Sequence, residues 1–259
     1  MKIAIDVETT GLEPGSRMIE LAAIAFDENG VIDQFNQLVN PGMPLPKDAL
    51  AINQITDDML ADKPDAGEVL RQFFAWLPCT ELIAHFACYD TGIISWEAGR
   101  FGIDIPEGLT VIDTCEIAKT IGETKNNKLV TLADHYALER HGEDHRALAD
   151  AHLCMEYFKL LHTRIDLKSL PWASVGHDYS YSAELPSHLS DLPDRIAAAT
   201  QLDFTYQDAK GDITERAITP YGFAMTPKGL MFHGYCHMRE ARRSFFVDRM
   251  VVNHEVSLT

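Results

Sequence analysis

The sequence contains few cysteines, no long apolar run and few basic residues. Its five cysteines are scattered and form no C-x-x-C pair, which argues against a disulfide framework or a zinc site: Cys79, Cys88, Cys115, Cys154 and Cys236. No apolar stretch approaches the roughly 20 residues that cross a bilayer. The first residues lack the pattern of a signal peptide. We therefore expect a cytoplasmic protein with no membrane association.

Basic residues are scarce, with 22 Lys and Arg against 39 Asp and Glu and a formal net charge of −17. Such a balance is unusual for a protein that binds nucleic acid through a broad basic surface. The excess of acidic over basic residues lies almost entirely before residue 190, because 8 of the basic and 9 of the acidic residues fall from residue 190 onward. Bound metal would neutralise part of the upstream excess, so we expect any nucleic acid to be held locally.

The apolar pattern predicts an α/β domain over residues 1–165. Strands are expected at 2–7, 18–26, 31–39, 81–85 and 109–112, and helices at 66–77, 90–101, 113–121, 129–136 and 145–161. The strands first follow one another and then alternate with helices, which indicates a mixed sheet.

A second, smaller domain is expected over residues 190–259. Residues 166–189 lose periodicity and gain Pro, Gly and Ser, which is typical of a linker. Beyond them, a short helix at 194–200 precedes alternating segments at 202–207, 213–219, 230–237 and 244–247. This pattern predicts a mostly β domain.

Two carboxylates, Asp6 and Glu8, lie at the end of the first predicted strand and precede Gly11. Side chains in a strand alternate between its faces, so these two point the same way. Neighbouring anions repel each other, and a hard divalent cation bound through oxygen relieves the repulsion. The sequence therefore predicts half of a metal site here.

Two later segments add carboxylates and histidines. Asp90 lies at the start of a predicted helix that follows His85, and Asp150 lies inside another helix among apolar neighbours. A buried acid is costly unless it is paired or metal-bound. Five residues turn a helix by roughly 140°, so His145 and Asp150 cannot share a face. We expect His145 at or before the helix start, after an N-cap at Asp144, as a proton carrier.

Three motifs resemble the DEDDh, or DnaQ-like, 3′→5′ exonucleases, the group that includes exonuclease X. They are D-V-E-T-T-G-L (6–12), H-F-A-C-Y-D (85–90) and H-R-A-L-A-D-A (145–151), supported by I-T-D-D-M-L-A-D-K-P (55–64) and V-I-D-T (111–114). The resemblance extends from about residue 2 to 163 and implies an RNase H-like mixed sheet flanked by helices. It also implies that two divalent ions are bound, with His145 as general base and these residues as metal ligands: Asp6, Glu8, Asp90 and Asp150.

The expected reaction is metal-dependent removal of nucleoside 5′-monophosphates from a single-stranded 3′ end. Magnesium or manganese suits an all-carboxylate site, and two such ions can assist both the attacking and the leaving oxygen. DNA is favoured on the likeness to exonuclease X. An exoribonuclease of short RNA ends stays open, because no residue is identified that reads the 2′-hydroxyl group. A nucleotide-sensing or nucleic-acid-binding regulator that uses the nuclease fold as a scaffold is a third reading.

Several residues are expected to contact the terminal nucleotide: Thr9, Thr10, Leu12, Met59 and Phe86. Phe86 stands where relatives often carry Asn, and Asn53-Gln54 stands where many carry His. His85 reads as a structural neighbour of the strand end, with a catalytic base as the alternative. Asp113 reads as a helix N-cap rather than a metal ligand.

The second domain resembles the WYL domain, a small Sm-like barrel. The segments that carry this resemblance are R-A-I-T-P (216–220), G-L-M-F-H-G-Y (229–235) and R-S-F-F-V-D-R-M (243–250), although M-F-H replaces the W-Y-L triplet. Phe232, Tyr235, Phe245 and Phe246 alternate with arginines, a mixture suited to stacking bases and binding phosphates, although aromatics in a small barrel are usually core. The candidate contacts are Arg216, Arg239, Arg242, Arg243 and Arg249.

Overall fold

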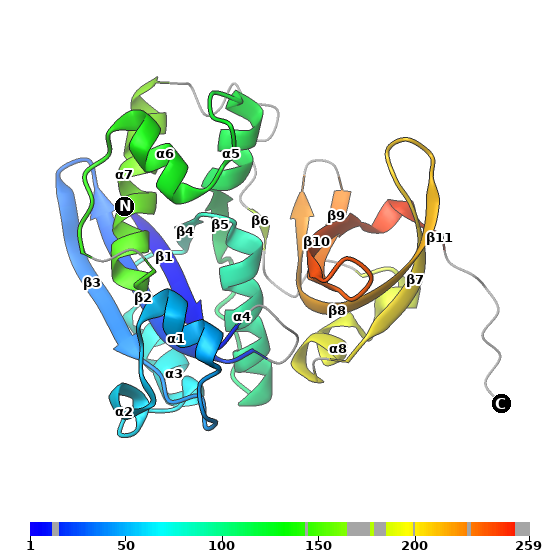
Figure 1. Ribbon diagram of the computed structural model, residues 1–259, viewed down its shortest axis with the longest axis horizontal. Coiled ribbons are helices and arrows are strands. Elements are labelled where there is room, and N and C mark those ends of the chain that lie inside the picture. The colour runs from blue at the N-terminus through cyan, green and yellow to red at the C-terminus, as the bar shows by residue number, and fades with distance from the viewer. Residues whose placement is uncertain are drawn as a thin grey trace.

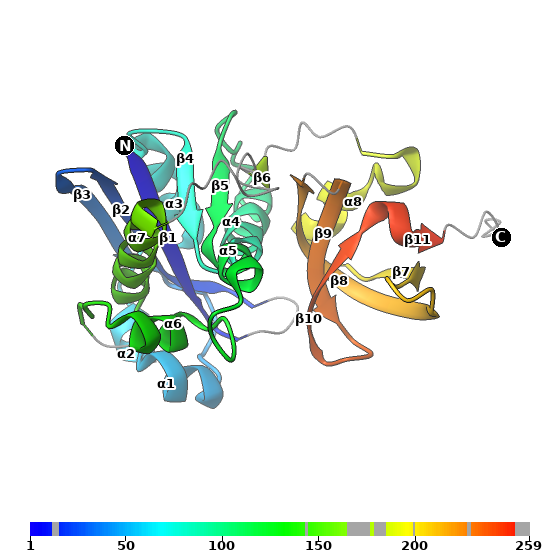
Figure 2. The same cartoon turned by 90° about the horizontal axis from the view of Figure 1, so that it is seen from above.

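A computed structural model shows two bodies joined by a single sheet (Figure 1). It describes residues 1–11, 16–142, 145–164, 177–178, 185–198, 200–226 and 229–251. The main path of the 11-stranded sheet has the order β10-β9-β8-β6-β5-β4-β1-β2-β3, and β7 and β11 branch from β8. Helices cover both faces of the first body, whereas the second is mostly strands (Figure 2). Among the residues that the structure describes, no helix is long and apolar enough to cross a membrane.

The first body contains the mixed sheet that the sequence predicts. The strands β1 (Lys2–Thr9), β2 (Met18–Asp27) and β3 (Gly30–Leu38) are antiparallel neighbours. On its other edge β1 runs parallel to β4 (Glu81–Ala84), which runs parallel to β5 (Thr110–Asp113). A tight turn joins β2 to β3, since Asp27 pairs with Gly30. This arrangement places β1 in the centre of the sheet, with its carboxylates among helices.

The two faces of β1 receive different helices. Ile3, Ile5 and Val7 pack with α3 (Ala66–Trp76) and α4 (Ala87–Arg100), whereas Ala4 packs with α7 (Ala147–Arg164). Two further helices, α5 (Thr114–Ile121) and α6 (Leu129–Tyr136), lie beside α7. Alternation along β1 therefore turns Asp6 and Glu8 toward the face of the sheet that α7 covers.

Two short helices were not predicted from the sequence. They are α1 (Lys47–Asn53) and α2 (Asp57–Leu60), which together occupy the segment between β3 and α3. Each is too short to show a full apolar period, and α1 leaves Leu50 and Ile52 exposed. Ile55, between the two helices, is fully buried against Ile19. That contact fixes the segment against the sheet.

The second body is a strongly antiparallel sheet. It contains β7 (Leu202–Gln207), β8 (Ile213–Thr226), β9 (Gly229–Cys236), β10 (Ala241–Phe246) and β11 (Met250–Val251), preceded by α8 (Leu192–Ala198). The strand β8 continues beyond the predicted end because a register shift between Pro220 and Gly222 accommodates the proline. Pairing runs β11-β7-β8-β9-β10, and among the described residues no pairing closes the predicted Sm-like barrel.

The segment expected to be a linker contributes β6 (His177–Asp178), which pairs with both β5 and β8. Residues 165–176 and 179–184 lie outside the described part. The helices α4 and α8 also pack together, and α4 contacts β8 (Figures 1 and 2). The domain boundaries at 165 and 190 stay a prediction, but the two bodies share both strand pairing and a helical contact.

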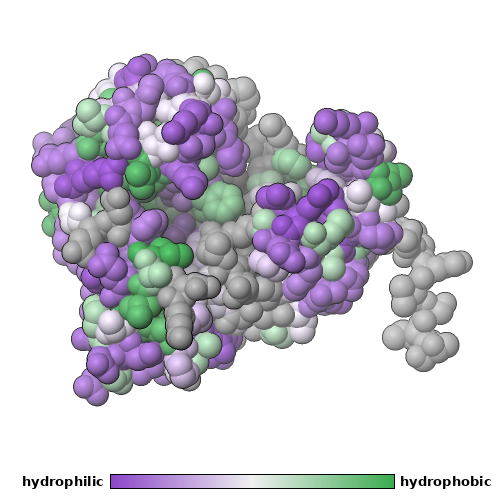
Figure 3. Space-filling model, viewed as in Figure 1, coloured by the Kyte–Doolittle hydropathy of each residue, from purple (hydrophilic) through white to green (hydrophobic). Residues whose placement is uncertain are grey.

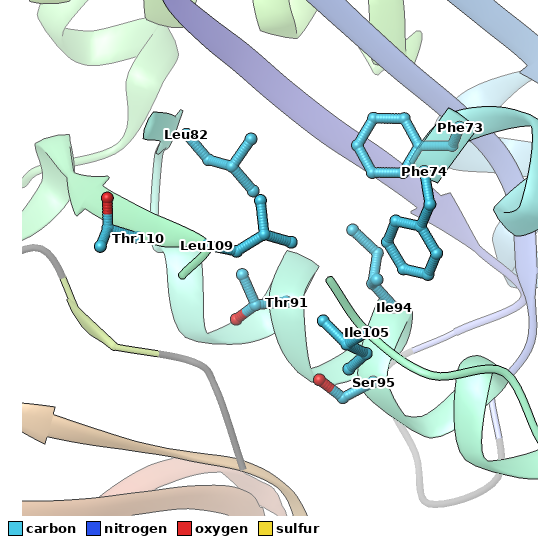
Figure 4. Close-up of a pocket in the computed structure, with 9 residues that line it drawn as sticks. All are labelled: Phe73, Phe74, Leu82, Thr91, Ile94, Ser95, Ile105, Leu109 and Thr110. Carbon is cyan, nitrogen blue, oxygen red and sulfur yellow. The ribbon is translucent and has the colours of Figure 1, made fainter. Parts of the chain in front are cut away.

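A small apolar cavity lies where α3, α4 and β5 meet (Figure 4). Its volume is about 20 Å³, and Phe73, Phe74, Ile94 and Leu109 point into it. None of the residues that line it is titratable. The cavity therefore offers no group for acid–base or metal chemistry.

Candidate active site

Three carboxylates from two distant parts of the sequence of the first body lie close together in space. Ligand oxygens of Asp6, Glu8 and Asp150 all lie within 4.8 Å of one another, and all three side chains are partly buried. Asp6 and Glu8 come from β1, and Asp150 comes from the first turn of α7. Every donor is a carboxylate oxygen, so the group fits a hard divalent cation such as Mg²⁺ or Mn²⁺ and suits a thiophilic metal poorly.

Asp90 approaches the same group from α4. Its side chain is 3% exposed, and its Oδ1 atom accepts a hydrogen bond from the backbone N–H of Val7 at 3.1 Å. That bond ties the start of α4 to β1 between Asp6 and Glu8. Asp90 also contributes to the raised pKa values of both β1 carboxylates. The structure therefore brings all four predicted ligands into one electrostatic cluster.

Burial and mutual repulsion raise the pKa values of the β1 acids. Desolvation is the main cause for Asp6, whose pKa lies well above its ordinary value, followed by the charges of Asp90 and Asp150. The pKa of Glu8 rises to about 8, again mainly through desolvation and then through Asp150 and Glu20. A hydrogen bond from the Asn53 side chain opposes this rise. The raised pKa values mean that Asp6 and Glu8 hold their protons more tightly than free carboxyl groups do, and a bound cation would displace these protons.

A buried ion pair that the sequence did not reveal holds the start of α7. Glu20 is 1% exposed and lies opposite Glu8 in the β1–β2 register. Its carboxylate accepts two hydrogen bonds from the Arg146 guanidinium, at 3.0 and 2.8 Å, and a third from the Ala147 backbone N–H at 3.1 Å. The pair therefore fixes the helix turn that follows His145 and precedes Asp150. An open pocket of about 330 Å³ borders it.

His145 lies immediately before α7, as predicted, and its side chain is exposed. Its φ of 62° is in the left-handed region, which is unusual for a residue with a side chain. The neighbouring Glu20–Arg146 pair holds the backbone that follows. Asp144, its expected N-cap, lies outside the described residues. An exposed imidazole can exchange protons with solvent.

The hydroxyl groups of Thr9 and Thr10 shape the turn that follows β1. The Thr9 hydroxyl donates to the Gly11 carbonyl oxygen at 2.8 Å and lies against the hydroxyl of Tyr89, which donates to the same oxygen at 3.0 Å. Thr10 accepts a hydrogen bond from the Arg17 backbone N–H at 2.9 Å. Both threonines are buried, so their hydroxyls serve the turn itself.

Phe86 has a left-handed backbone, with φ 71°, at the N-terminus of α4. Asp113 holds this conformation, because its carboxylate accepts the backbone N–H groups of Phe86 at 3.1 Å and Ala87 at 3.0 Å. The same carboxylate accepts from the N–H groups of Cys115 and Glu116, which confirms its predicted role as the N-cap of α5. A strained residue held this firmly is typical of a functional position.

His85 is occupied structurally. Its Nδ1 atom lies 2.9 Å from the Thr114 hydroxyl, and its Nε2 atom lies 2.7 Å from the carbonyl oxygen of Asn127. Burial lowers its pKa, which favours the neutral ring. Both nitrogens are engaged, so the structural reading is favoured over a catalytic base.

The remaining expected nucleotide contacts are Met59 and Leu12. Met59 is half-buried in α2, and its backbone N–H bonds to Thr56. Leu12 lies outside the described residues.

The sequence missed α1, whose last residue, Asn53, is 2% exposed and bonds to Glu8. Figure 3 shows hydrophobic surface gathered over α1. Apolar surface thus lies next to the carboxylates.

The arginines of the second body occupy its surface. Arg239, Arg243 and Arg249 are exposed, and Arg216 is half-buried. The backbone of Arg242 is described, opposite Tyr235 in the β9–β10 register, but its side chain is not. No described contact joins these arginines to the carboxylate cluster.

Two of the aromatics that were expected to stack on bases are core residues instead. Phe232 is fully buried and Phe245 is 4% exposed, and their rings pack with Phe204 at centroid distances of 5.3 Å each. Tyr235 and Phe246 are half-buried and keep some accessible surface. Of the two alternatives, the structure favours core packing over base stacking for Phe232 and Phe245, since a small domain needs its aromatics to fill its core.

Two family models match the chain. The model described as Exonuclease matches residues 3–158, and the model described as WYL domain matches residues 187–253. Together they cover both bodies of the fold and leave out most of the segment that contains β6.

Two curated relatives are DNA polymerase components. The chain is 37% identical over 159 residues to DNA polymerase III subunit epsilon of Treponema pallidum, covering 60% of this chain and 73% of that protein. It is 32% identical over 197 residues to DNA polymerase III PolC-type of Bacillus cereus, covering 73% of this chain and 14% of that protein. The chain thus spans a small part of the PolC-type protein.

Two solved structures share the fold of the first body. Exonuclease X in complex with 5′ overhanging duplex DNA is 24% identical, with a TM-score of 0.52, covering 63% of this chain and 93% of that chain. The nuclease domain of 3′hExo, a DEDDh family member, bound to rAMP, is 16% identical with a TM-score of 0.55, covering 62% and 91%. At these identities the likeness shows the fold alone.

Proposed function

The chain belongs to the exonuclease family, and on that premise we propose that it is a metal-dependent 3′→5′ exonuclease that releases nucleoside 5′-monophosphates. The observation that carries this proposal is the convergence of Asp6, Glu8 and Asp150 within 4.8 Å. Buried Asp90 completes the cluster. Such a concentration of buried negative charge is unfavourable unless cations offset it, and cations are what hydrolysis of a phosphodiester needs.

The ligands would be Asp6, Glu8, Asp90 and Asp150, and the ions would be two Mg²⁺ or Mn²⁺. Bound there, the cations would supply positive charge to offset the phosphodiester charge that grows during hydrolysis. The chain's own residues do the rest. Asn53 orients Glu8 through its side-chain hydrogen bond, and Val7 orients Asp90. His145 accepts the proton of the attacking water at its imidazole, because an imidazole can act as a general base.

DNA is the proposed substrate, with a single-stranded 3′ end entering the site. Two relatives named as DNA polymerase components and a structural neighbour in complex with DNA support this choice. The neighbour bound to rAMP keeps an exoribonuclease as the alternative. Thr9, Thr10, Leu12, Met59 and Phe86 stay the proposed nucleotide contacts.

The second domain is proposed to contact nucleic acid or a nucleotide through its arginines: Arg216, Arg239, Arg242, Arg243 and Arg249. The exposure of Arg239, Arg243 and Arg249 supports this role, because guanidinium groups bind phosphate bidentately. A nucleotide bound there that regulates the first domain is the alternative. A cytoplasmic location remains part of the proposal, and the five free cysteines suit a reducing compartment.

The test is direct. Single-stranded DNA, duplex DNA and RNA, each labelled at the 5′ end, are incubated with Mg²⁺ or Mn²⁺ and with wild type or Asp6→Ala. Wild type should shorten at least one polymer stepwise, with 5′-monophosphates as products, and Asp6→Ala should not. Absence of metal-dependent shortening of every polymer would refute the proposal. The relative rates on DNA and RNA decide between the two substrates.

A further inference from the structure

One tryptophan of the first body belongs to the core of the second. Trp96, on α4, is 7% exposed, and its cluster of buried neighbours includes Leu189, Leu192 and Ile196. The same helix carries Asp90 near its start. Figures 1 and 2 both show α4 between the sheet of the first body and the second body. Helix α4 is therefore shared by the carboxylate cluster and the core of the second domain.

Two guanidinium groups lie over the Trp96 ring. The Arg17 guanidinium carbon is 4.7 Å from the ring centroid, and that of Arg100 is 5.3 Å away. The charge of Arg100 lowers the pKa of Arg17, after desolvation, whereas Glu97 opposes the shift. The Nη1 atom of Arg17 is buried and has no hydrogen-bond partner among the described residues. With one buried donor unpaired and a like charge nearby, Arg17 depends on the face of Trp96 for its position.

The backbone of Arg17 is hydrogen-bonded to Thr10, the residue that follows β1. Its backbone N–H donates to the Thr10 hydroxyl and its carbonyl oxygen accepts from the Thr10 N–H, both at 2.9 Å. The next residue, Met18, donates its N–H to buried Glu97 at 3.2 Å. Thr9 and Gly11 contact the hydroxyl group of Tyr89, which lies on the same helix. Thr9 and Gly11 on one side, and Arg17 and Met18 on the other, therefore all contact α4.

We propose that docking of the second domain on α4 positions Thr9, Thr10 and Gly11, which follow Asp6 and Glu8, for hydrolysis, with Trp96 and Arg17 as the positioning residues. In this role the second domain supports catalysis through α4, separately from any strand binding by its arginines. The inference rests on the proposed exonuclease function. The connection runs from α8 to α4, whose Trp96 belongs to the core of the second domain, then from Trp96 to Arg17 and from Arg17 to Thr10.

A small substrate separates positioning from strand binding. The p-nitrophenyl ester of thymidine 5′-monophosphate contains one phosphodiester and no further nucleotides, so it offers the second domain no strand to hold. In full-length Arg17→Gln and Trp96→Leu, kcat on this ester should fall roughly tenfold or more, because small misplacements of a site are costly, while KM changes little. Arg17→Lys should recover part of the loss, since it keeps a cation over the ring.

Matched controls and a double variant make the test specific. Trp76→Leu removes a tryptophan that packs on Phe73, and Arg71→Gln removes an exposed arginine of α3; both should retain wild-type kcat. Arg17→Gln combined with Trp96→Leu should lose no more than the worse single variant, because both act through one contact. Thermal unfolding shows whether Trp96→Leu is folded, and Arg17→Gln carries the test if it is not.

The outcomes are distinct. If wild type hydrolyses the ester and Arg17→Gln does so equally well, the positioning role is wrong and the exonuclease function stands. Equal losses for Arg17→Gln and Arg71→Gln would also overturn it. If wild type hydrolyses neither the ester nor any polymer, the proposed function fails and the inference fails with it.

Discussion

The two bodies of the molecule both have apolar cores, but they differ in the charge that they bury. The first buries carboxylates close to β1, among them Asp90 and Glu20, with little of their surface exposed. The second buries an aromatic cluster around Phe204, Phe232 and Phe245 and keeps its described arginines at the surface. A buried aromatic cluster stabilises a fold by itself, whereas buried carboxylates need protons, cations or basic partners. The difference teaches that, among the described residues, buried charge is confined to the first body.

The largest effect is expected when one carboxylate of the cluster is neutralised. Asp150→Asn should lower the rate of polymer hydrolysis roughly a thousandfold or more, because a cation ligand and its charge are lost. The metal-free variant should nevertheless unfold at a higher temperature than wild type, since repulsion with Asp6 and Glu8 is relieved. Hydrolysis rates and thermal unfolding in EDTA measure the two effects. Glu28→Gln, an exposed acid, should change neither. An unchanged rate for Asp150→Asn would contradict its role as ligand.

Glu20, the buried carboxylate opposite Glu8, has a basic partner and should respond in the opposite way. Glu20→Gln leaves Arg146 without its anion, so it should cost about 3 kcal/mol of unfolding free energy, near the low end for a buried pair because Arg146 is partly exposed. The rate should also fall, because the turn between His145 and Asp150 loosens. Urea unfolding of Glu20→Gln, Arg146→Met and the double variant measures the coupling. Additive losses would show that the pair does not act as a unit.

The raised pKa values predict an inverse dependence of stability on pH. Glu8 has a folded pKa of about 8 against an ordinary value of 4.5, so the folded protein retains a proton that the unfolded chain loses. Stability of the metal-free protein should therefore fall as pH rises from about 4.5 to about 8. Added Mg²⁺ should stabilise more at pH 8 than at pH 6, since fewer protons must be displaced. Unfolding temperatures measured with and without Mg²⁺ test this, and Glu8→Gln should flatten the metal-free profile.

The smallest effect is expected at the surface of the second body. Arg239→Gln should weaken binding of single-stranded DNA a few-fold and reduce the slope of log affinity against log salt by about 1, if one phosphate contact is lost. Lys210→Gln, an exposed cation in the β7–β8 turn, is the matched control and should leave the slope unchanged. Equal slopes for wild type and Arg239→Gln would place DNA elsewhere on the protein.

Local patterns predicted most of the first body. The apolar runs of β1 and β2 and the helical period of α3 were visible in the chain, and so was the N-cap role of Asp113. The helices α1 and α2 were missed because they are short and held by a distant contact through Ile55. In the second body, alternation predicted the strands but could not say whether they close into a barrel, since closure depends on pairing between strand ends.

The missed members of the site share one cause. Glu20 looks like an ordinary polar residue in a strand, and Asn53 looks like part of a loop, until folding places them beside Glu8. Trp96 looks like a core residue of its own domain, yet it packs with residues about a hundred positions later. A faint signal existed for Glu20, because a lone acid inside an apolar strand implies a buried partner.

The sequence by itself determined which chemistry we propose, because Asp6, Glu8, Asp90, His145 and Asp150 stand in motifs that resemble those of the DEDDh exonucleases. Only the tertiary structure decided what surrounds that chemistry. It gave Glu20 its partner, placed His145 at an exposed helix start and joined Trp96 to the second domain. The physical reason is range: a motif records local periodicity, whereas burial and charge pairing depend on residues that only folding brings together.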